Sequence, residues 1–303
     1  MSVHAFRNAA VIGLIFALCP AAGGGQERTV RDDAGQVFTL AEPPRRIVSL
    51  APNITEILFA LGLGDRVVGV TRYCDYPAAA RDKDKVGGLT DPGVERIGAL
   101  KPDLVIAFRG NPWDVIQKLR ALRLKVFVLD IGQDLEAVPK TIEKIGRITQ
   151  RDGEARALIR TLESRFQKVT AALSAVTVKP RVFLNLHGLN LATCGGPSYL
   201  NALLERAKSV NIAGRAAKAW LEYSREQFIK DDPEIIVVLA ASAEAFEKAR
   251  DWFRTQAGFE TVAAVRAGRI YFLDENAASR FGPRLYDAFA ELARLLHPEI
   301  FYR

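Results

Sequence analysis

From residue 46 onward, the chain alternates short apolar runs with segments whose apolar residues recur every three or four positions. Runs such as RIVSL at 46–50, DLVIAF at 103–108 and VFVLD at 126–130 have the length and composition of buried strands. The segments between them have the periodicity of amphipathic helices. Regular alternation of strands and helices predicts an α/β fold with central, mostly parallel sheets.

One segment is too long for an ordinary connection between two strands. Residues 152–176 have the pattern of a single helix, with no Gly or Pro after Gly153. Its apolar stripe consists of Leu158, Leu162, Phe166, Val169 and Leu173. A helix of about 24 residues spans about 36 Å, enough to pass from one lobe to another. We therefore expect an N-terminal lobe over 46–150, a connecting helix over 151–177 and a C-terminal lobe over 178–303.

A phrase of about fourteen residues occurs twice. ERIGALKPDLVIAF at 95–108 and EQFIKDDPEIIVVL at 226–239 both begin with Glu, reach Pro after six residues, continue with an acid and enter an apolar run. The recurrence at the same place in each series predicts two similar α/β lobes. Helix, Pro, acid and strand is also a common form of helix-to-strand turn, and a Glu at a helix start gains from the helix dipole. Both explanations of the repeat stay open at this stage.

The sequence predicts the local environment of two polar residues at helix ends. Asn111 precedes Pro112 and an amphipathic segment, so we expect its side chain to cap that helix. His297 ends the last amphipathic segment, where a solvated cation favours the helix dipole.

The first residues read as a targeting segment. Arg7 supplies a positive charge, residues 9–18 are apolar, and small residues follow Cys19, which predicts a signal peptide over 1–22 and an extension over 23–45. Ten apolar residues are too few to span a bilayer, which takes about 18. The predicted signal peptide implies that the protein is exported. Lipid attachment at Cys19 is an alternative, although the preceding Leu18 is not small.

Composition excludes some functions and leaves others open. The net charge of +7 is spread among 42 basic and 35 acidic residues without a basic block, so nucleic-acid binding is not indicated. Cys74 and Cys194 remain after export, each is expected in a loop of a different lobe, and they form a possible disulfide. No nucleotide-binding, zinc-protease or serine-hydrolase motif occurs. His187 follows the strand RVFLNL, at the strand end where ligands gather in open α/β sheets.

Several stretches together carry a family resemblance. RIVSLAPNITEILFALGLGDRVVGV, RYCDYP, KVGGLTDPGVERIGALKPDLVIAFRGN and LKVFVLD closely resemble the N-terminal lobe of periplasmic substrate-binding proteins of ABC importers for cobalamin, haem and ferric siderophores. The cobalamin-binding branch is the best match. SREQ, DDPEIIVV and SRFGPR carry a thinner resemblance in the second lobe.

The resemblance implies a function and its partners. It implies a non-enzymatic periplasmic monomer with two lobes, one rigid connecting helix and a ligand cleft between the lobes. A corrinoid such as cobalamin is the first candidate ligand, and haem or a ferric siderophore is the alternative. A hydrolytic or metal-dependent enzyme using His187 is a weaker alternative from another class. The implied partner is an ABC permease dimer with its ATPase, through which alone the protein would meet the membrane, and no catalytic cofactor is implied.

The resemblance also implies roles for individual residues. Glu95 and Glu226 match the surface glutamates that dock each lobe onto the permease. The implied ligand-binding residues are Tyr73, Phe108, Arg109, His187, Trp220, Asn276 and Arg280. Tyr73 or His187 is a possible axial ligand to a bound metal. Leu89 replaces an aromatic residue of well-known cobalamin binders, which reduces the expected stacking surface.

Overall fold

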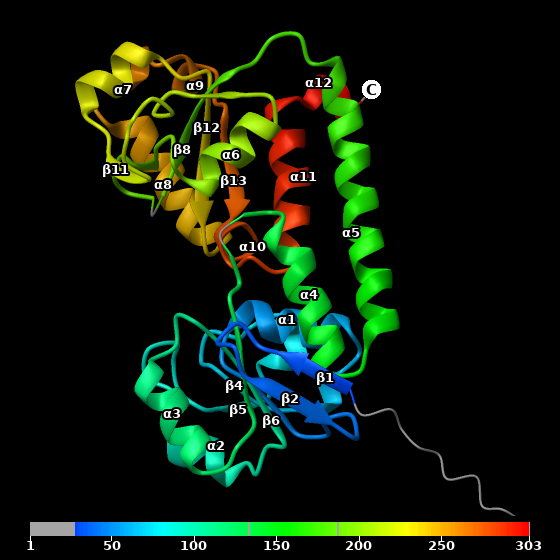
Figure 1. The fold of residues 1–303 in the computed structure, drawn as a ribbon. Coiled ribbons are helices and arrows are strands. Elements are labelled where there is room, and N and C mark those ends of the chain that lie inside the picture. Colours follow the sequence, from blue (N-terminus) through cyan, green and yellow to red (C-terminus); the bar gives the residue numbers. More distant parts are fainter. Residues whose placement is uncertain (1–27, 133, 187, 303) are drawn as a thin grey trace, which may run out of the picture.

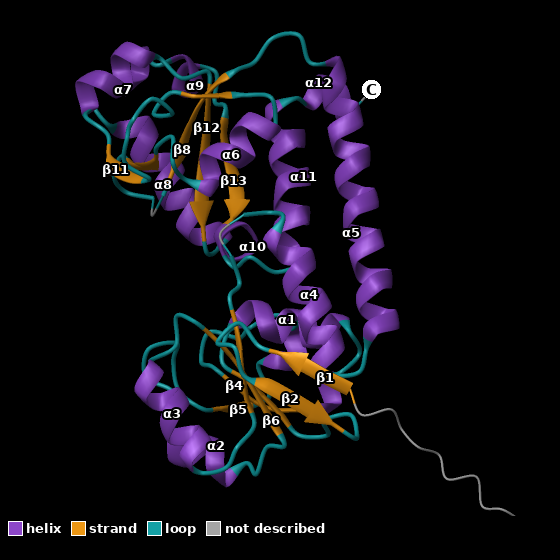
Figure 2. Ribbon diagram, viewed as in Figure 1, coloured by secondary structure: helices purple, strands orange, loops and turns teal. Residues whose placement is uncertain are grey.

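The computed structural model describes residues 28–132, 134–186 and 188–302. The expectations for the signal peptide, Cys19 and His187 lie outside these residues. The described chain forms two α/β lobes, one built around each of two larger sheets (Figures 1 and 2). The predicted fold class is therefore confirmed. Within the described ranges, no helix is both long and apolar enough to cross a membrane.

The N-terminal lobe contains a five-stranded sheet in which every neighbouring pair is parallel. In spatial order its strands are β5 (Asp84–Lys85), β4 (Val67–Val70), β3 (Ile47–Ser49), β6 (Leu104–Phe108) and β7 (Val126–Leu129). Its helices are α1 (Pro52–Ala60), α2 (Val94–Ala99), α3 (Trp113–Ala121) and α4 (Ala137–Ile148), with short 3-10 turns η1 (Gly64–Arg66) and η2 (Ala78–Ala80). The central strands are buried on both faces, which explains their continuous apolar runs.

A hairpin that the apolar pattern did not predict precedes this sheet. It consists of β1 (Arg28–Arg31) and β2 (Val37–Leu40), and its turn lies against β7. The Asp32 carboxylate accepts a hydrogen bond from Val128 N at 3.2 Å and pairs with Arg120 at 3.1 Å. Asp33 N donates to Val128 O at 2.9 Å. The turn thereby covers the open edge of the sheet, which would otherwise present unpaired backbone groups.

The C-terminal lobe contains a six-stranded sheet. Its main order is β11 (Trp220–Glu222), β9 (Ala192–Cys194), β8 (Arg181–Asn185), β12 (Ile235–Ala240) and β13 (Ile270–Asp274), and β10 (Val210–Asn211) pairs with β8. The pairs of β8 with β10 and β12, and of β12 with β13, are parallel, whereas β9 and β11 are antiparallel additions. Its helices are α6 (Tyr199–Arg206), α7 (Arg225–Asp231), α8 (Ala243–Thr255), α9 (Ala263–Arg266), α10 (Glu275–Ser279), α11 (Arg284–Leu296) and α12 (Pro298–Phe301), with η4 (Phe259–Thr261).

The parallel part of the sheet has the same arrangement in both lobes. Strands β4, β3, β6 and β7 of the first sheet have the same order and direction as β10, β8, β12 and β13 of the second. Helix α2 leads into β6, and α7 leads into β12. The prediction of two similar lobes is confirmed.

The acid after each Pro of the repeated phrase has a structural role. The Asp103 carboxylate accepts a hydrogen bond from Arg46 N at 3.0 Å, and the Glu234 carboxylate accepts one from Arg181 N at 2.8 Å. Each arginine lies at the start of the strand that neighbours its acid. The repeated acid therefore ties the helix-to-strand corner to the adjacent strand in both lobes.

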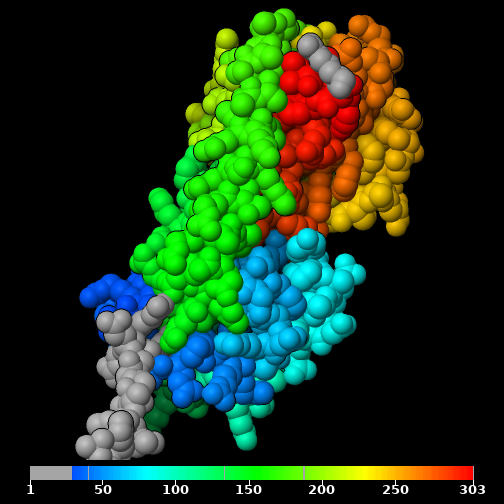
Figure 3. Space-filling model, turned by 90° about the vertical axis from the view of Figure 1, so that its right-hand side faces the viewer, coloured from blue at the N-terminus to red at the C-terminus, as the bar shows by residue number. Residues whose placement is uncertain are grey.

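Helix α5 (Asp152–Ala172) joins the lobes and continues as the 3-10 turn η3 (Leu173–Ala175). It runs along one side of both lobes (Figure 3). Leu162 is buried, and the Phe166 ring contacts the rings of Tyr286 and Phe289 of α11 at 6.0 and 5.0 Å. The apolar stripe seen in the sequence therefore packs against the last long helix.

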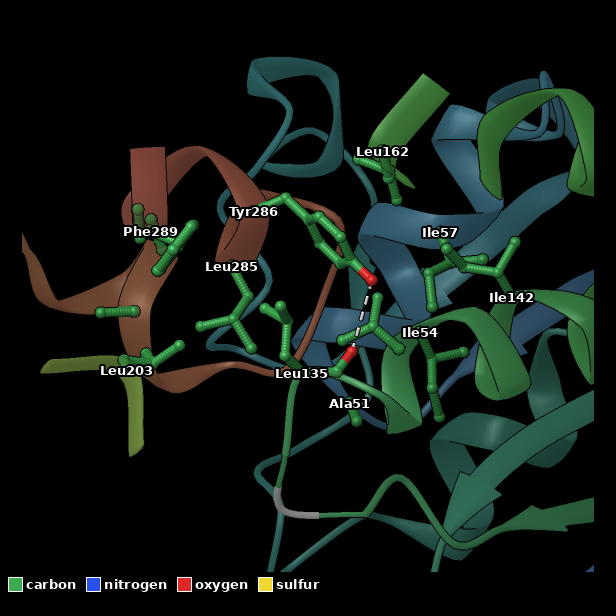
Figure 4. Packing of buried hydrophobic residues seen from close by; sticks show 14 of the residues in the cluster. Ala51, Ile54, Ile57, Leu135, Ile142, Leu162, Leu203, Leu285, Tyr286 and Phe289 are labelled. Carbon is green, nitrogen blue, oxygen red and sulfur yellow. Dashed lines mark hydrogen bonds between the residues drawn. The ribbon is translucent and has the colours of Figure 1, made fainter. Parts of the chain in front are cut away.

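The lobes also share a hydrophobic core beside α5 (Figure 4). Ile54 and Ile57 of α1 belong to the same buried cluster as Leu285 and Tyr286 of α11. The Tyr286 hydroxyl donates a hydrogen bond to Leu135 O of the N-terminal lobe at 3.4 Å. Because packed cores resist sliding, this contact limits relative motion of the lobes.

Two local expectations at helix ends were wrong. His297 is buried rather than solvated, and its Nε2 lies 2.8 Å from Ala207 O, because the end of α11 packs beneath the end of α6. Asn111 does not cap α3. Its side chain instead accepts from Phe108 N and donates to Leu50 O and Leu89 O, so it joins the ends of β3 and β6 to the loop after β5.

Candidate functional site

The carboxyl ends of the parallel strands of the two lobes face each other. Asp75, in the loop after β4, accepts two hydrogen bonds from Arg280, which follows α10 at the end of β13. The two distances are 2.5 and 3.1 Å, and Arg280 also donates to Asn276 Oδ1 at 2.6 Å. The structure thus brings together two of the predicted ligand residues, Arg280 and Asn276, with an acid of the opposite lobe.

A second ion pair crosses between the lobes beside the first. Arg284 donates to both carboxylate oxygens of Glu56 at 3.1 and 2.7 Å, and it lies 4.2 Å from the centre of the Tyr76 ring. Glu56 is only 4% exposed. Burial raises the pKa of its carboxyl, whereas the hydrogen bond and charge of Arg284 act to lower it. A fork-shaped guanidinium that satisfies both oxygens offsets much of the cost of burying this acid.

Sequence reasoning missed this second pair. Glu56 is the one acid within the apolar helix segment PNITEILFA, and that isolation was the available signal. Arg284 follows Pro283 in the SRFGPR segment, whose first Arg alone had been assigned a role.

Trp220 begins β11 and belongs to a row of aromatic rings. The Tyr199 ring lies 6.0 Å from that of Trp220 and 4.7 Å from that of Phe281. Beside the row is a cavity of about 490 Å³ with mainly apolar walls, here called the Tyr199 cavity, whose lining includes Tyr199, Trp220 and Glu275. Tyr199, Phe281 and the cavity were not anticipated.

The three candidates of the N-terminal lobe lie at strand ends but are not gathered together. Tyr73 is 48% exposed, and its neighbour Arg72 lies 5.7 Å from the ring centre. Phe108 is half-buried and covers Gly110, where an added Cβ would lie 2.2 Å from the ring. No ring contact joins Tyr73, Phe108 or Trp220 to one another within the described part of the chain.

Arg109 is already engaged. Its guanidinium donates to Asp33 O at 2.6 Å, and its Nε lies 4.0 Å from the Asp130 carboxylate. The predicted ligand arginine therefore also anchors the turn of the N-terminal hairpin.

The possible disulfide is not formed. Cys74 and Cys194 are both free and buried, and Cys194 lies in β9 rather than in a loop. The Cys74 sulfur receives hydrogen bonds within its own lobe, including one from Thr55 Oγ1 at 3.1 Å. Burial raises the pKa of Cys194 to about 11, so this group remains a thiol. Both cysteines belong to a buried hydrophobic cluster, and the bond across the lobes that the sequence left possible is absent between these two residues.

Glu95 and Glu226 occupy equivalent positions. Each is the second residue of its helix, α2 or α7, and each is exposed. Within the described ranges, neither carboxylate accepts a hydrogen bond or forms an ion pair. This distinguishes them from Asp103 and Glu234, the acids of the same repeat that serve the fold.

Comparison with known proteins places these features in a family. A family model described as periplasmic binding protein matches residues 47–277. An uncharacterized ABC transporter substrate-binding lipoprotein of Bacillus subtilis, YvrC, is 31% identical over 280 residues, covering 90% of this chain and 86% of the relative. A vitamin B12-binding protein of Photorhabdus laumondii is 30% identical over 260 residues, covering 86% and 90%.

Solved structures show the same two-lobed arrangement. The periplasmic vitamin B12-binding protein BtuF of Vibrio cholerae is 27% identical, with a TM-score of 0.69, and covers 86% of this chain and 99% of its own. The periplasmic haem-binding protein BhuT, in complex with two haems, is 25% identical, with a TM-score of 0.75 and coverages of 84% and 98%. The match of the family model to most of the chain, together with these relatives, shows that the chain belongs to the periplasmic binding protein family.

Proposed function

We propose that this protein is the substrate-binding component of an ABC importer, and that it captures cobalamin or a related corrinoid between its lobes and delivers it to the permease. The support comes from relatives named as vitamin B12-binding proteins and from the chemistry of the interlobe face. The relatives are named as binding proteins, and we propose no catalytic role for the cleft.

The observation that carries the choice of ligand is the pairing of the arginines at the interlobe strand ends. Arg72 donates to both oxygens of Asp91, Arg109 is engaged by the hairpin turn, and Arg280 is engaged by Asp75. Arg284 is engaged by Glu56. Haem and most ferric siderophores carry carboxylates or other anionic oxygens, which bind best to unpaired cations.

A corrinoid suits this surface better. Its periphery carries neutral carboxamides, which need hydrogen-bond donors and acceptors rather than free cations. Its flat, apolar ring suits exposed aromatic faces, and Tyr73 and Trp220 are about half exposed, one on each lobe. We propose Tyr73, Phe108, Trp220, Asn276 and Arg280 as ligand contacts, with Arg109 in a structural role as well. His187 belongs to the same proposal but lies outside the described residues.

Haem is the second candidate, and one observation favours it. The likeness to the haem-binding protein BhuT covers 84% of this chain. In that case the exposed phenol of Tyr73 would be the axial ligand to iron.

The proposed partners follow from the family and from the repeat. A permease dimer with its ATPase would present the same docking pocket twice, and Glu95 and Glu226 offer one exposed acid on each similar lobe. We propose a monomer that is exported to the periplasm by the signal peptide over residues 1–22, which is removed from the mature protein. Attachment through Cys19 is the alternative, and one relative is named as a lipoprotein.

Binding measurements test the proposal. The purified protein is titrated by calorimetry with cyanocobalamin, cobinamide and hemin separately, and the visible spectrum of each mixture is recorded. We expect a saturable heat with at least one corrinoid and weaker binding of hemin. Binding of hemin with no response to either corrinoid would establish the haem alternative, and no binding of any of the three would overturn both.

A further inference from the structure

The Tyr199 cavity lies entirely within the C-terminal lobe. Its apolar walls are formed by Leu186, Leu200, Leu221 and Leu239, with the rings of Tyr199 and Trp220 beside them. These residues come from the ends of β8 and β12, from β11 and from the first turn of α6. A volume of about 490 Å³ is too small for a whole corrin or porphyrin but accommodates part of its edge.

Two polar groups at this cavity, on Tyr199 and Glu275, have no hydrogen-bond or ion-pair partner among the described residues. The Tyr199 hydroxyl makes no hydrogen bond, and the Glu275 carboxylate makes neither a hydrogen bond nor an ion pair, within the residues that the structure describes. The other hydroxyls at the cavity are engaged, because Thr193 donates to Leu184 O at 2.7 Å and Ser279 donates to Glu275 O at 2.6 Å. The cavity therefore offers one free phenol and one free carboxylate.

The protonation of Tyr199 suits a donor. Burial raises the pKa of its phenol, and the nearby charge of Glu275 raises it further. The hydroxyl therefore keeps its proton and is able to donate a hydrogen bond to a carbonyl oxygen.

The two arginines that follow Glu275 in the chain are engaged by other groups, which leaves the Glu275 carboxylate available. Arg280, five residues along the chain, is engaged by Asp75 and Asn276, and Arg284 is engaged by Glu56 and Asp274. A ligand carboxylate entering the cavity would lose water and meet a like charge. A carboxamide would instead present N–H groups to Glu275 and a carbonyl oxygen to Tyr199.

We propose that the Tyr199 cavity binds an apolar edge of the ligand together with one peripheral carboxamide, and that Glu275 and Tyr199 select the carboxamide over a carboxylate. This inference rests on the proposed function and names a specificity determinant within it. Glu275 accepts from the amide nitrogen, Tyr199 donates to the amide oxygen, and the leucines cover the adjoining methylene groups.

The test compares ligands that differ in one amide. Calorimetry measures binding of cyanocobalamin and of its monocarboxylic acid derivatives, in each of which one peripheral carboxamide is hydrolysed. We expect the unmodified protein to bind cyanocobalamin about tenfold more tightly than at least one derivative. Glu275→Gln should remove most of that preference, because the like-charge repulsion is gone, whereas Glu260→Gln, at an exposed acid in the 3-10 turn η4, should preserve it.

Two further variants test the cavity independently of the charge. Tyr199→Phe keeps the ring and removes the hydroxyl, and it should weaken cyanocobalamin binding by about threefold to tenfold. Ala192→Leu adds volume to the cavity wall and should weaken it further. If corrinoids bind and the preference is the same in Glu275→Gln, or if both cavity variants bind normally, this inference fails while the proposed function stands. If no corrinoid binds the unmodified protein, the proposed function fails as well.

Discussion

Arg280 of the C-terminal lobe and Asp75 of the N-terminal lobe, 205 residues apart in sequence, form a two-bond ion pair. Arg280 is 14% exposed, whereas Asp75 is 42% exposed, so the acid lies at the outer side of the pair. The pair links the loop after β4 to the end of α10, the two segments that were expected to contact a ligand from opposite sides. A ligand that reaches Arg280 must therefore either leave this pair intact or replace Asp75 as its partner.

The pair should make stability depend on pH. The hydrogen bond from Arg280 lowers the pKa of Asp75 below its ordinary value of 3.8, although partial burial opposes this. A lowered pKa in the folded state means that the contribution is present above about pH 3.8 and is lost as the pH falls through the lowered value. Urea unfolding of the unmodified protein and of Asp75→Asn should give free energies of unfolding that differ by about 1 kcal/mol at neutral pH and converge in acid. A difference that is unchanged down to about pH 2 would contradict this assignment.

The buried pair of Glu56 and Arg284 should matter more to stability. Arg284→Met removes both hydrogen bonds to the buried Glu56 carboxylate and leaves it only the longer contact with Arg280 at 3.8 Å, so we expect a loss of about 3 kcal/mol in the free energy of unfolding. The double variant with Glu56→Met removes both charges and should lose less than Arg284→Met alone. Arg165→Met breaks an exposed pair with Asp287 between α5 and α11, and this control should change stability by about 1 kcal/mol or less. Equal losses for Arg284→Met and Arg165→Met, measured by urea unfolding, would show that burial of the pair has no energetic consequence.

Much of the fold was predictable because its signals are local. The buried parallel strands and the connecting helix each repeat their apolar pattern over enough residues to be recognised. The antiparallel strands β9 and β11 have three residues each, too few to show a period, and the hairpin β1–β2 depends on contacts with β7 far along the chain.

The candidate site was less predictable, because its contacts join distant segments. Glu56 and Arg284 are 228 residues apart, and no pattern around either residue names the other. The burial of His297 likewise depends on its contact with Ala207 at the end of α6, 90 residues earlier in the chain. Local periodicity predicts which face of an element is buried, whereas the partner across the interface is set by the packing of the lobes.

The cysteines should behave as two inaccessible thiols. Both are free and buried, and burial raises the pKa of Cys194 to about 11, so the reactive thiolate is scarce at neutral pH. We expect the mature protein, without residues 1–22, to react slowly with a thiol reagent when folded and at two sites in denaturant. Intact mass should be the same with and without reductant. A gain of two hydrogens on reduction would show that a disulfide forms after all.

The two acids in each copy of the repeated phrase should affect different properties: the acid after Pro should affect stability, and the Glu at the start should affect transport. Asp103 and Glu234 accept backbone hydrogen bonds from Arg46 and Arg181, so Asp103→Ala with Glu234→Ala should lower the free energy of unfolding by about 1–3 kcal/mol.

Within the described residues Glu95 and Glu226 accept no such hydrogen bond, so Glu95→Ala with Glu226→Ala should lose only the helix-dipole contribution, about 1 kcal/mol or less in the free energy of unfolding, and should leave ligand affinity unchanged. Acids that meet basic pockets on a permease chiefly determine orientation and encounter rate, so the same double variant should abolish uptake in vesicles reconstituted with the cognate permease and ATPase. Each single variant should give an intermediate rate of uptake, because one lobe still docks. If uptake is normal in the double variant, the exposed glutamates repeat only because the helices that carry them repeat, and docking must use another surface of the lobes.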